Sequence, residues 1–404
     1  MNSGLARVHP VYAAMETTVF ETMSGLARQL GAINLGQGFP DEQGPPELIA
    51  AAAHALSEKS NQYPPGAGLP ELRDAIGAFY ARRQGLELAR DQIVVTSGAT
   101  EAIAAAVLAF VQPGDEVILF QPAYDAYGPM VRRAGGVPVS VALRPPEWGY
   151  SAEALEAAIT PRTRVLMLND PLNPAGTVAS EAELAAIARI CVTHDLIAIC
   201  DEVWEEVRFD GVPHRSLLSF PGMAERAVKI GSAGKIFGLT GWKIGWMCAA
   251  PEMAGALGRV HQFLTYTSPP ALQWAVAEGL ALPGAWFATR TGVWASSRAR
   301  LKQGLEQAGY AVLPNAATWF LCVDLAASGI ALTDREFSEK ALREAGVASI
   351  PVSALFEGDA PKNVVRFCFT KSDAVLDEAV KRLADFRLHL SRQSDNAQQG
   401  AVHD

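Results

Sequence analysis

Apolar and polar positions alternate along the middle of the chain in blocks that predict strands and helices in turn. A strand at residues 93–96 (IVVT) leads into an Ala-rich helix that runs to about Val111. Further apolar strands follow, with helical segments between most of them: EVILF, VPVSVAL, RVLML, LIAIC and AVKIG. Strands that alternate with helices imply right-handed crossovers and a sheet covered on both faces. The expected fold class is therefore α/β, with a mainly parallel central sheet in a large domain.

The flanking segments predict helices before this block and a smaller α+β unit after it. Helical patterns cover residues 17–30 and 46–57, and another begins near Pro70. The segment WKIGWMCAA is a candidate for an antiparallel strand, and a helical stretch from 251 to about 300 leads to strands near 318–324, 348–350 and 364–369. We expect four parts: an N-terminal arm with part of the small domain at 1–45, a large domain at 46–285, a small C-terminal domain at 286–390 and a disordered tail at 391–404.

Length, charge and cysteine content narrow the class of protein. The chain has 404 residues, enough for two domains, and a net charge of −9, which argues against nucleic acid or an anionic membrane as a partner. Its five cysteines are scattered with no close pair, which excludes a zinc ribbon and favours a reducing compartment. The N-terminal residues contain no apolar signal core, and the longest apolar run, 102–111, is too short to span a bilayer. We therefore expect a cytoplasmic protein without a metal site.

The segment GSAGKIFGLTGWKIGW (231–246) places Lys235 among small residues, directly after an apolar strand. A phosphate-binding P-loop is excluded, because Lys229 stands where its first glycine would be and Ile236 where a Ser or Thr would follow the lysine. Most lysines are solvated surface groups, and this segment alone leaves that alternative open. An amine held in tight, apolar surroundings has a lowered pKa and becomes nucleophilic, as a Schiff-base lysine requires.

Polar residues follow several of the predicted strands, which is where ligands bind in open α/β sheets. Ser97–Thr100, Asn173, Asp201 and Ser232–Lys235 would all lie at one edge of the sheet. Asp201 ends an apolar strand, so it requires a cation, either a protonated pyridine nitrogen or a salt-bridge partner. Together these segments predict one site.

The other candidates each have a structural alternative. The residues after Ser97 begin a helix, whose free N–H groups suit a phosphate, although an ordinary N-cap would look the same. Asn173 precedes Pro174 and would also suit a turn. Tyr124 would either stack on an aromatic ring or pack in the core.

Ordered motifs over residues 17–390 carry a resemblance to one family. The motifs are INLGQGFPDEQGP, NQYPPGAGLPELR, TSGATEAI, PGDEVILFQPAYDAYGPM, NPAGTV, DEVW, SAGKIFGLTGWKIGW, VHQF and VVRFCF. The chain resembles the class I (fold type I) pyridoxal-phosphate-dependent aminotransferases, in the branch of kynurenine–oxoglutarate transaminase, glutamine transaminase K and bacterial methionine aminotransferase. This resemblance implies pyridoxal 5′-phosphate as the cofactor and a homodimer whose subunits share their sites.

The resemblance also implies which residues bind the cofactor. Lys235 would form the Schiff base, Asp201 would keep the ring nitrogen protonated and Tyr124 would stack on the ring. Asn173 would bond the ring oxygen. Trp204 stands where the family has a tyrosine whose hydroxyl bonds that oxygen, so the indole N–H is the donor available there. The phosphate would contact Gly98, Ala99, Thr100, Ser232, Lys243 and, from the neighbouring subunit, Tyr63.

For the substrate, the resemblance implies that Arg366 grips the α-carboxylate through two parallel hydrogen bonds, near Gly38 and Asn173. The partner subunit would contribute Tyr266 and Thr267. No arginine can be assigned to a distal carboxylate, and an apolar pocket would be lined by Tyr12, Phe20, Tyr124 and Tyr266.

We therefore expect an aminotransferase that moves an α-amino group from a large neutral or aromatic amino acid to a 2-oxo acid. Methionine, glutamine, phenylalanine, tyrosine, tryptophan and kynurenine are the expected donors. One alternative is a cysteine-conjugate β-lyase on the same scaffold, which would expel a leaving group from the β-carbon. The other is a non-catalytic sensor that only binds pyridoxal phosphate.

Overall fold

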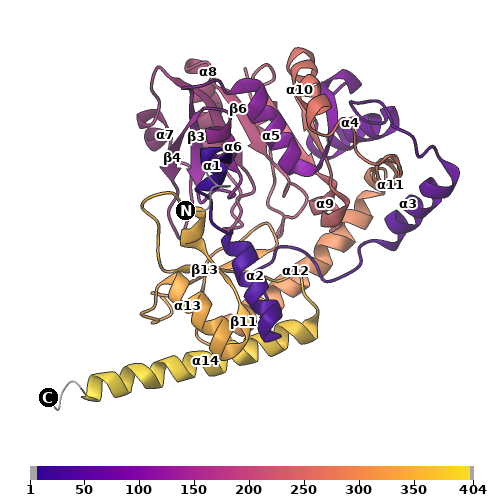
Figure 1. Ribbon diagram of the computed structural model, residues 1–404. Helices are drawn as coiled ribbons and strands as arrows, with labels where there is room; N and C mark the ends of the chain where they lie inside the picture. The colour runs from indigo at the N-terminus through magenta and orange to yellow at the C-terminus, as the bar shows by residue number, and fades with distance from the viewer. Residues whose placement is uncertain (1–6, 401–404) are drawn as a thin grey trace.

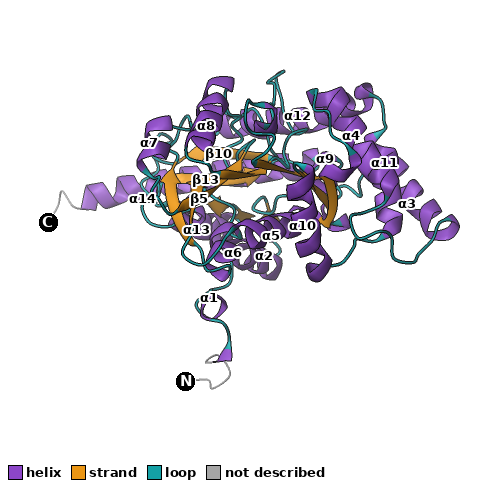
Figure 2. Cartoon of the chain, turned by 90° about the horizontal axis from the view of Figure 1, so that it is seen from above, coloured by secondary structure: helices purple, strands orange, loops and turns teal. Residues whose placement is uncertain are grey.

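The computed structural model of this chain describes residues 7–400, and its centre is a seven-stranded sheet (Figures 1 and 2). The strand order is β4-β3-β5-β6-β7-β8-β2, and neighbouring strands are parallel except that β8 runs antiparallel to both β7 and β2. These strands are β2 (Ile93–Ser97), β3 (Glu116–Gln121), β4 (Val137–Ala142), β5 (Thr163–Asn169), β6 (Ile197–Asp201), β7 (Ala227–Ser232) and β8 (Ile244–Cys248).

Helices lie on both sides of this sheet, with α8 on one side and α5 and α10 on the other (Figure 2). A capping box of Ser180 and Glu183 begins α8. In the described part of the chain, no helix is both long enough and apolar enough to cross a membrane. The helices of this layer are α3 (Pro46–Glu58), α4 (Pro70–Gln84), α5 (Gly98–Phe110), α6 (Tyr127–Arg133), α7 (Ala152–Ala157), α8 (Glu181–Thr193), α9 (Ala233–Ile236), α10 (Pro251–Leu264), α11 (Pro270–Leu280) and α12 (Gly284–Gln307).

A smaller layer lies beside the large one, and the long α12 leads into it (Figure 1). It holds a four-stranded antiparallel sheet in the order β12-β13-β10-β9 and a short parallel pair, β1 and β11. Its strands are β1 (Ile33–Asn34), β9 (Ala311–Val312), β10 (Phe320–Asp324), β11 (Val347–Ala348), β12 (Ile350–Pro351) and β13 (Val364–Cys368). The remaining helices are α1 (Pro10–Ala13), α2 (Val19–Leu30), α13 (Asp334–Lys340) and α14 (Asp373–Gly400).

Most elements match the prediction, including the antiparallel strand in WKIGWMCAA, and two differ. The helical stretch expected from 251 to about 300 is divided into three helices, because Pro270 and Gly284 each start a new one. Helix α14 continues to Gly400, so residues 391–400 are helical where we expected disorder; hydrogen bonds within a helix can extend it without burial. The ends of the predicted arm and tail, 1–6 and 401–404, lie outside the described residues. The domain limits at 45, 285 and 390 stay a prediction.

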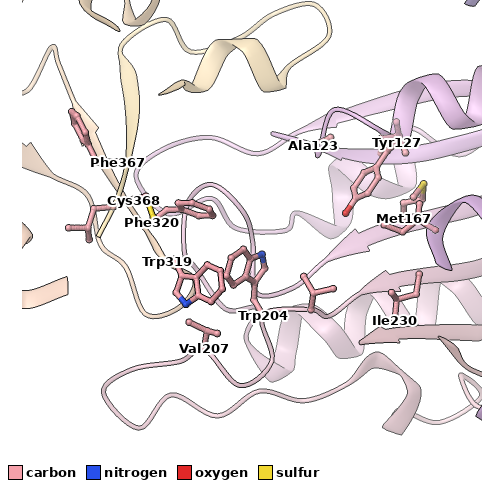
Figure 3. Close-up of a cluster of buried hydrophobic side chains, with 14 of the residues drawn as sticks. Ala123, Tyr127, Met167, Trp204, Val207, Ile230, Trp319, Phe320, Phe367 and Cys368 are labelled. Atoms are coloured by element: carbon pink, nitrogen blue, oxygen red, sulfur yellow. The ribbon is translucent and has the colours of Figure 1, made fainter. Parts of the chain in front are cut away.

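One apolar core joins the two layers (Figure 3). Met167 and Ile230 of the large sheet belong to the same cluster of buried side chains as Phe367 of the small sheet. At the contact between the layers, Trp204 packs edge-on against Trp319, with ring centroids 4.9 Å apart. Since Trp204 lies just beyond the end of β6, the layers meet beside the edge of the sheet where the sequence predicts a site.

Candidate active site

The polar residues predicted at the strand ends surround one cavity of about 560 Å³. Asn169 and Asp201 are register neighbours at the ends of β5 and β6, and Ser232 ends β7. Parallel strands bring these ends to one edge of the sheet, where the start of α5 and Lys243 also lie. The predicted residues that line the cavity are Phe20, Gly38, Gly98, Ala99, Thr100, Tyr124, Asn173, Asp201, Trp204, Ser232, Lys235, Lys243 and Arg366.

Lys235 lies in the one-turn helix α9, directly after β7, and lines the cavity. Burial lowers the pKa of its amine to about 8, although the Asp201 carboxylate opposes this change. The Nζ atom lies 4.7 Å from the centre of the Trp204 ring, and it makes no hydrogen bond to another residue of the described chain. Because a substantial fraction of such an amine is neutral near physiological pH, it can act as a nucleophile and as a proton carrier.

Asp201 is buried at the end of β6, and a tyrosine that the sequence did not indicate holds it. The Tyr127 hydroxyl donates a hydrogen bond of 2.5 Å to Asp201 Oδ2, and the Val203 N–H donates a longer one of 3.4 Å to Oδ1. Burial raises the pKa of Asp201, and the hydrogen bond from Tyr127 opposes that rise. A buried carboxylate in this position suits a cationic ligand atom such as a protonated ring nitrogen.

The start of α5 and Lys243 form the part of the cavity suited to an anion. Gly98 and Lys243 both have a positive φ, 73° and 54°, so the chain turns sharply at each. A Cβ atom on Gly98 would lie 3.1 Å from Lys243 Nζ, which places the lysine amine beside the free N–H groups of the helix start. At Gly245, an added Cβ would lie 2.7 Å from the Gly98 carbonyl carbon, so only a glycine permits this approach. A helix N-terminus next to an ammonium group fits a phosphate.

Arg366 reaches the cavity from β13 of the small sheet. Its Nη1 donates to Asn173 Oδ1 at 3.0 Å, and its Nη2 donates to the Gly36 carbonyl at 2.7 Å. The guanidinium lies 3.9 Å from the centre of the Phe320 ring, and Nε is buried without a hydrogen-bond partner. Burial lowers the pKa of Arg366 to about 10, which leaves it cationic at neutral pH. A fixed guanidinium with an unused donor fits a carboxylate.

These parts fit the cofactor that the resemblance implies. The anion site accepts a phosphate, the Asp201 carboxylate accepts a cationic ring nitrogen, and the Lys235 amine faces the same space. Asn173 uses its side-chain oxygen for Arg366, so its amide N–H groups remain for a ring oxygen. Figure 3 shows the Trp204 indole nitrogen on the side of the ring turned away from Trp319.

Four predicted residues do not line the cavity of this chain. The Tyr63 side chain is 81% exposed and packs edge-on against Tyr266, with ring centroids 5.3 Å apart. Thr267 follows Tyr266, and its hydroxyl is buried without a hydrogen-bond partner. Tyr12 lies on α1 and is 51% exposed. The roles of Tyr63, Tyr266 and Thr267 require a second subunit, so they stay predictions.

The structure adds residues that the sequence did not single out. Tyr127 stands three positions after Tyr124, yet nothing in the motif FQPAYDAY indicates that its hydroxyl contacts Asp201, 74 residues away. Asp125, which lies between these two tyrosines in the sequence, also lines the cavity. Trp319 packs against Trp204, and the centre of its ring lies 5.1 Å from Lys235 Nζ. The spacing of Tyr127 from Tyr124 is visible in the sequence, but it does not predict a contact with the end of a strand 74 residues away.

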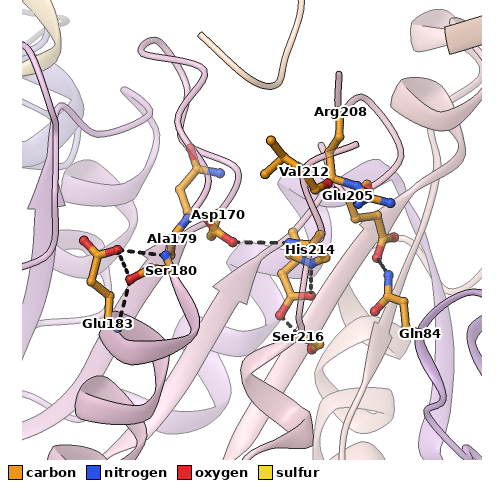
Figure 4. Close-up of polar contacts among 12 residues, drawn as sticks. Gln84, Asp170, Ala179, Ser180, Glu183, Glu205, Arg208, Val212, His214 and Ser216 are labelled. Carbon is orange, nitrogen blue, oxygen red and sulfur yellow. Dashed lines mark hydrogen bonds and ion pairs between the residues drawn. The ribbon is translucent and has the colours of Figure 1, made fainter. Parts of the chain in front are cut away.

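A group of buried charged residues, among them Asp170, Glu205 and His214, lies beside the central sheet (Figure 4). Lys229 Nζ donates to Glu202 and Glu205 at 2.5 and 2.6 Å. His214 lies between two carboxylates, with Nε2 3.0 Å from Glu202 and Nδ1 3.2 Å from Asp170. Glu202, Glu205 and His214 are close enough to share a cation, and Lys229 supplies one. Burial alone would lower the pKa of His214, but Asp170 and Glu202 raise it to about 9.

We expect this group to make stability depend on pH. The folded-state pKa of His214 lies above its ordinary value, so its contribution is complete below about pH 6.5 and is lost as the pH rises through about 9. At about 1.4 kcal/mol per pH unit, the loss over this window is about 3.5 kcal/mol. The urea midpoint should fall over this range in the natural protein and fall less in His214→Gln. Parallel pH profiles for the two proteins would contradict the assignment.

Comparison with known proteins agrees with this geometry. Residues 31–383 match the family model described as aminotransferase class I and II. The chain is 46% identical over 380 residues to a probable N-succinyldiaminopimelate aminotransferase of Mycobacterium tuberculosis, covering 91% of this chain and 96% of that protein. It is 38% identical over 368 residues to methionine aminotransferase of Escherichia coli, covering 91% and 95%. The solved structure of the Mycobacterium tuberculosis enzyme superposes with a TM-score of 0.90 at 45% identity, over 93% of this chain and 99% of that one.

Proposed function

Since the chain belongs to the class I and II aminotransferases and has their fold type I architecture, we propose that it moves an α-amino group from a large neutral or aromatic amino acid to a 2-oxo acid. Enzymes of this family use pyridoxal 5′-phosphate. The observation that carries the proposal is the Lys235 amine, which faces the cavity with a lowered pKa near the buried Asp201.

The residues of this chain divide the work between binding and proton transfer. When bound, the cofactor supplies an electrophilic carbon and a ring that delocalises negative charge. The Asp201 carboxylate, held by the Tyr127 hydroxyl, would stabilise the protonated form of the ring nitrogen. The anion site at the start of α5 holds the phosphate. Lys235 Nζ would take the proton from the substrate α-carbon as a general base and then release it, as a general acid, to the carbon on the other side of the transferred nitrogen.

Two observations support a neutral substrate side chain. Among the described residues that line the cavity, the cationic ones are Lys235, Lys243 and Arg366, and each already has a proposed role. Asp125 lines the same cavity, and burial raises the pKa of its carboxyl while Arg366 opposes that rise. A distal carboxylate on the substrate would therefore meet a carboxyl group and no free cation.

We expect Asp125→Asn to relax the discrimination against acidic substrates. The substitution keeps the shape of the side chain and removes its charge, so kcat/KM for glutamate relative to glutamine should rise about tenfold. The ratio is measured in the natural enzyme, in Asp125→Asn and in a control, Asp359→Asn, whose carboxylate pairs with Arg144 at the surface. An unchanged ratio in Asp125→Asn would show that Asp125 does not determine the preference for neutral substrates.

The relatives favour a second candidate donor. One relative is a probable N-succinyldiaminopimelate aminotransferase at 46% identity, and that compound carries carboxylates far from the reacting amine. Kynurenine–oxoglutarate transaminase 1 of Homo sapiens is 33% identical over 399 residues, covering 90% of this chain and 94% of that protein. The absence of a free cation in the described cavity wall supports the neutral donors over the succinylated one.

We also propose that the enzyme works as a cytoplasmic homodimer. The family is generally dimeric. The side chains of Tyr63 and Phe263 are 81% and 86% exposed, which is unusual for aromatic residues, and a partner subunit would cover them. Tyr63, Tyr266 and Thr267 would then complete the site of the neighbouring chain. The five cysteines are all free and buried, as suits a reducing compartment.

A screen of half-reactions tests the proposed function. The purified protein, loaded with pyridoxal phosphate, is mixed with single amino acids, and the visible absorbance of the aldehyde form is followed. Methionine, glutamine, kynurenine and the aromatic amino acids should bleach it, and a 2-oxo acid should restore it. Bleaching by N-succinyldiaminopimelate alone would favour that donor. Release of pyruvate and ammonia from a cysteine conjugate without a 2-oxo acid would indicate a β-lyase. If no compound changed the absorbance, the protein would be a sensor that only binds the cofactor.

A further inference from the structure

The Lys235 amine lies in a corner made by two indole rings. Its Nζ atom is 4.7 Å from the centre of the Trp204 ring and 5.1 Å from the centre of the Trp319 ring. The two rings are nearly perpendicular, at 83°, with centroids 4.9 Å apart. A cation within about 6 Å of an indole face is attracted by the ring's negative face, and the attraction is strongest where water is excluded.

The corner is rigid because its rings are themselves packed. Trp319 is fully buried and contacts Trp294 edge-on, with centroids 5.4 Å apart. Trp204 is also buried and contacts Phe320 with centroids 5.4 Å apart. Neither indole can therefore turn away from the amine without disturbing the core between the layers (Figure 3).

We propose that Trp204 and Trp319 are positioning residues that hold the Lys235 amino group at the cavity through cation–π contact whenever the amine carries a proton and is not covalently bound. The inference rests on the proposed function, because the position of the free amine matters during the step in which Lys235 carries a proton to and from the substrate. The described chain offers the amine no hydrogen-bond acceptor, so the two ring faces replace one. The other groups that act electrostatically on it are Asp201, Arg366, Lys243 and Cys368.

The test changes the electron density on the faces of the indole rings while it keeps the shape of the rings. The full-length chain is produced with 5-fluorotryptophan, which weakens the negative face of the indole and leaves the packing almost unchanged. After removal of the cofactor, the pH dependence of Lys235 acylation is followed by mass spectrometry of its peptide. We expect the midpoint to fall by about half a pH unit on fluorination, because the protonated amine loses attraction.

A double variant supplies the control for the other tryptophans. In Trp204→Phe/Trp319→Phe the amine still faces aromatic rings, but fluorotryptophan elsewhere in the chain can no longer reach it, so fluorination should leave the midpoint unchanged. A midpoint that does not move on fluorination of the natural sequence, or that moves equally in the double variant, would overturn the proposal. The measurement needs no turnover, so it stays informative if the half-reaction screen fails and only the proposed function is lost.

Discussion

Lys235→Ala should abolish transamination, lowering kcat/KM by at least about 10⁴-fold, because in the proposed mechanism one amine serves as both nucleophile and proton carrier. The lowered pKa of about 8 supports both roles, since the neutral form is accessible near physiological pH. Turnover with glutamine and a 2-oxo acid gives the rate, and the single half-reaction with glutamine gives the proton-transfer step alone. Both should be lost together.

Two further variants test whether activity depends on the reactive amine of Lys235 or only on a positive charge. Lys235→Arg keeps the positive charge but cannot lose its proton at ordinary pH, so it should be as inactive as Lys235→Ala. Lys302→Ala removes a partly exposed lysine of α12 whose nearest carboxylate is 3.9 Å away, and it should retain full activity. If Lys235→Ala kept a rate within tenfold of the natural enzyme, the site would have to be placed elsewhere.

Asp201→Asn should lower kcat/KM by about 10³-fold, the second-largest effect expected. The amide keeps the size of the side chain but has no negative charge, so a cationic ring nitrogen loses its partner in a buried site. The defect should lie in kcat more than in KM, because charge develops on the ring as the α-proton leaves. Steady-state kinetics over a range of glutamine concentrations separates the two constants.

Tyr127→Phe gives a graded comparison for Asp201→Asn. It removes only the hydroxyl that donates to Asp201 Oδ2, so the carboxylate keeps its charge and loses its anchor. We expect about a tenfold loss in kcat, between the natural enzyme and Asp201→Asn. Asp195→Asn, a change at an exposed carboxylate paired with Arg226, should have no effect. Equal activity in Asp201→Asn and the natural enzyme would refute the role of the carboxylate.

The sequence indicated the large sheet well because its strands are short apolar runs that end in polar residues. The same feature located Lys235 and Asp201, since both directly follow such runs and parallel strands bring their ends together. Helix α14 continues beyond residue 390, where composition indicated disorder, because each added residue of a helix gains a hydrogen bond to the turn before it.

Side-chain partners were the part that the sequence could not supply. In the run DEVWEE, Glu202 and Glu205 are buried and bound to Lys229 from the neighbouring strand, a pairing that their positions in the sequence do not predict. The pairing depends on β6 and β7 lying side by side with Cys200 opposite Lys229, a register that composition and periodicity do not contain. The contact of Tyr127 with Asp201 has the same origin.

Arg366 has a consequence for motion. It is rooted in the small sheet, while its two terminal nitrogens grasp the Gly36 carbonyl and the Asn173 side chain, which belong to segments far apart in the chain. If Arg366 binds the substrate carboxylate as proposed, its unused Nε and the second N–H of each terminal nitrogen can receive that carboxylate while both segments stay bound. A bound substrate would then rest on the same side chain that connects the small sheet to the loop after β5, and no contact between the two layers would have to break when it arrives.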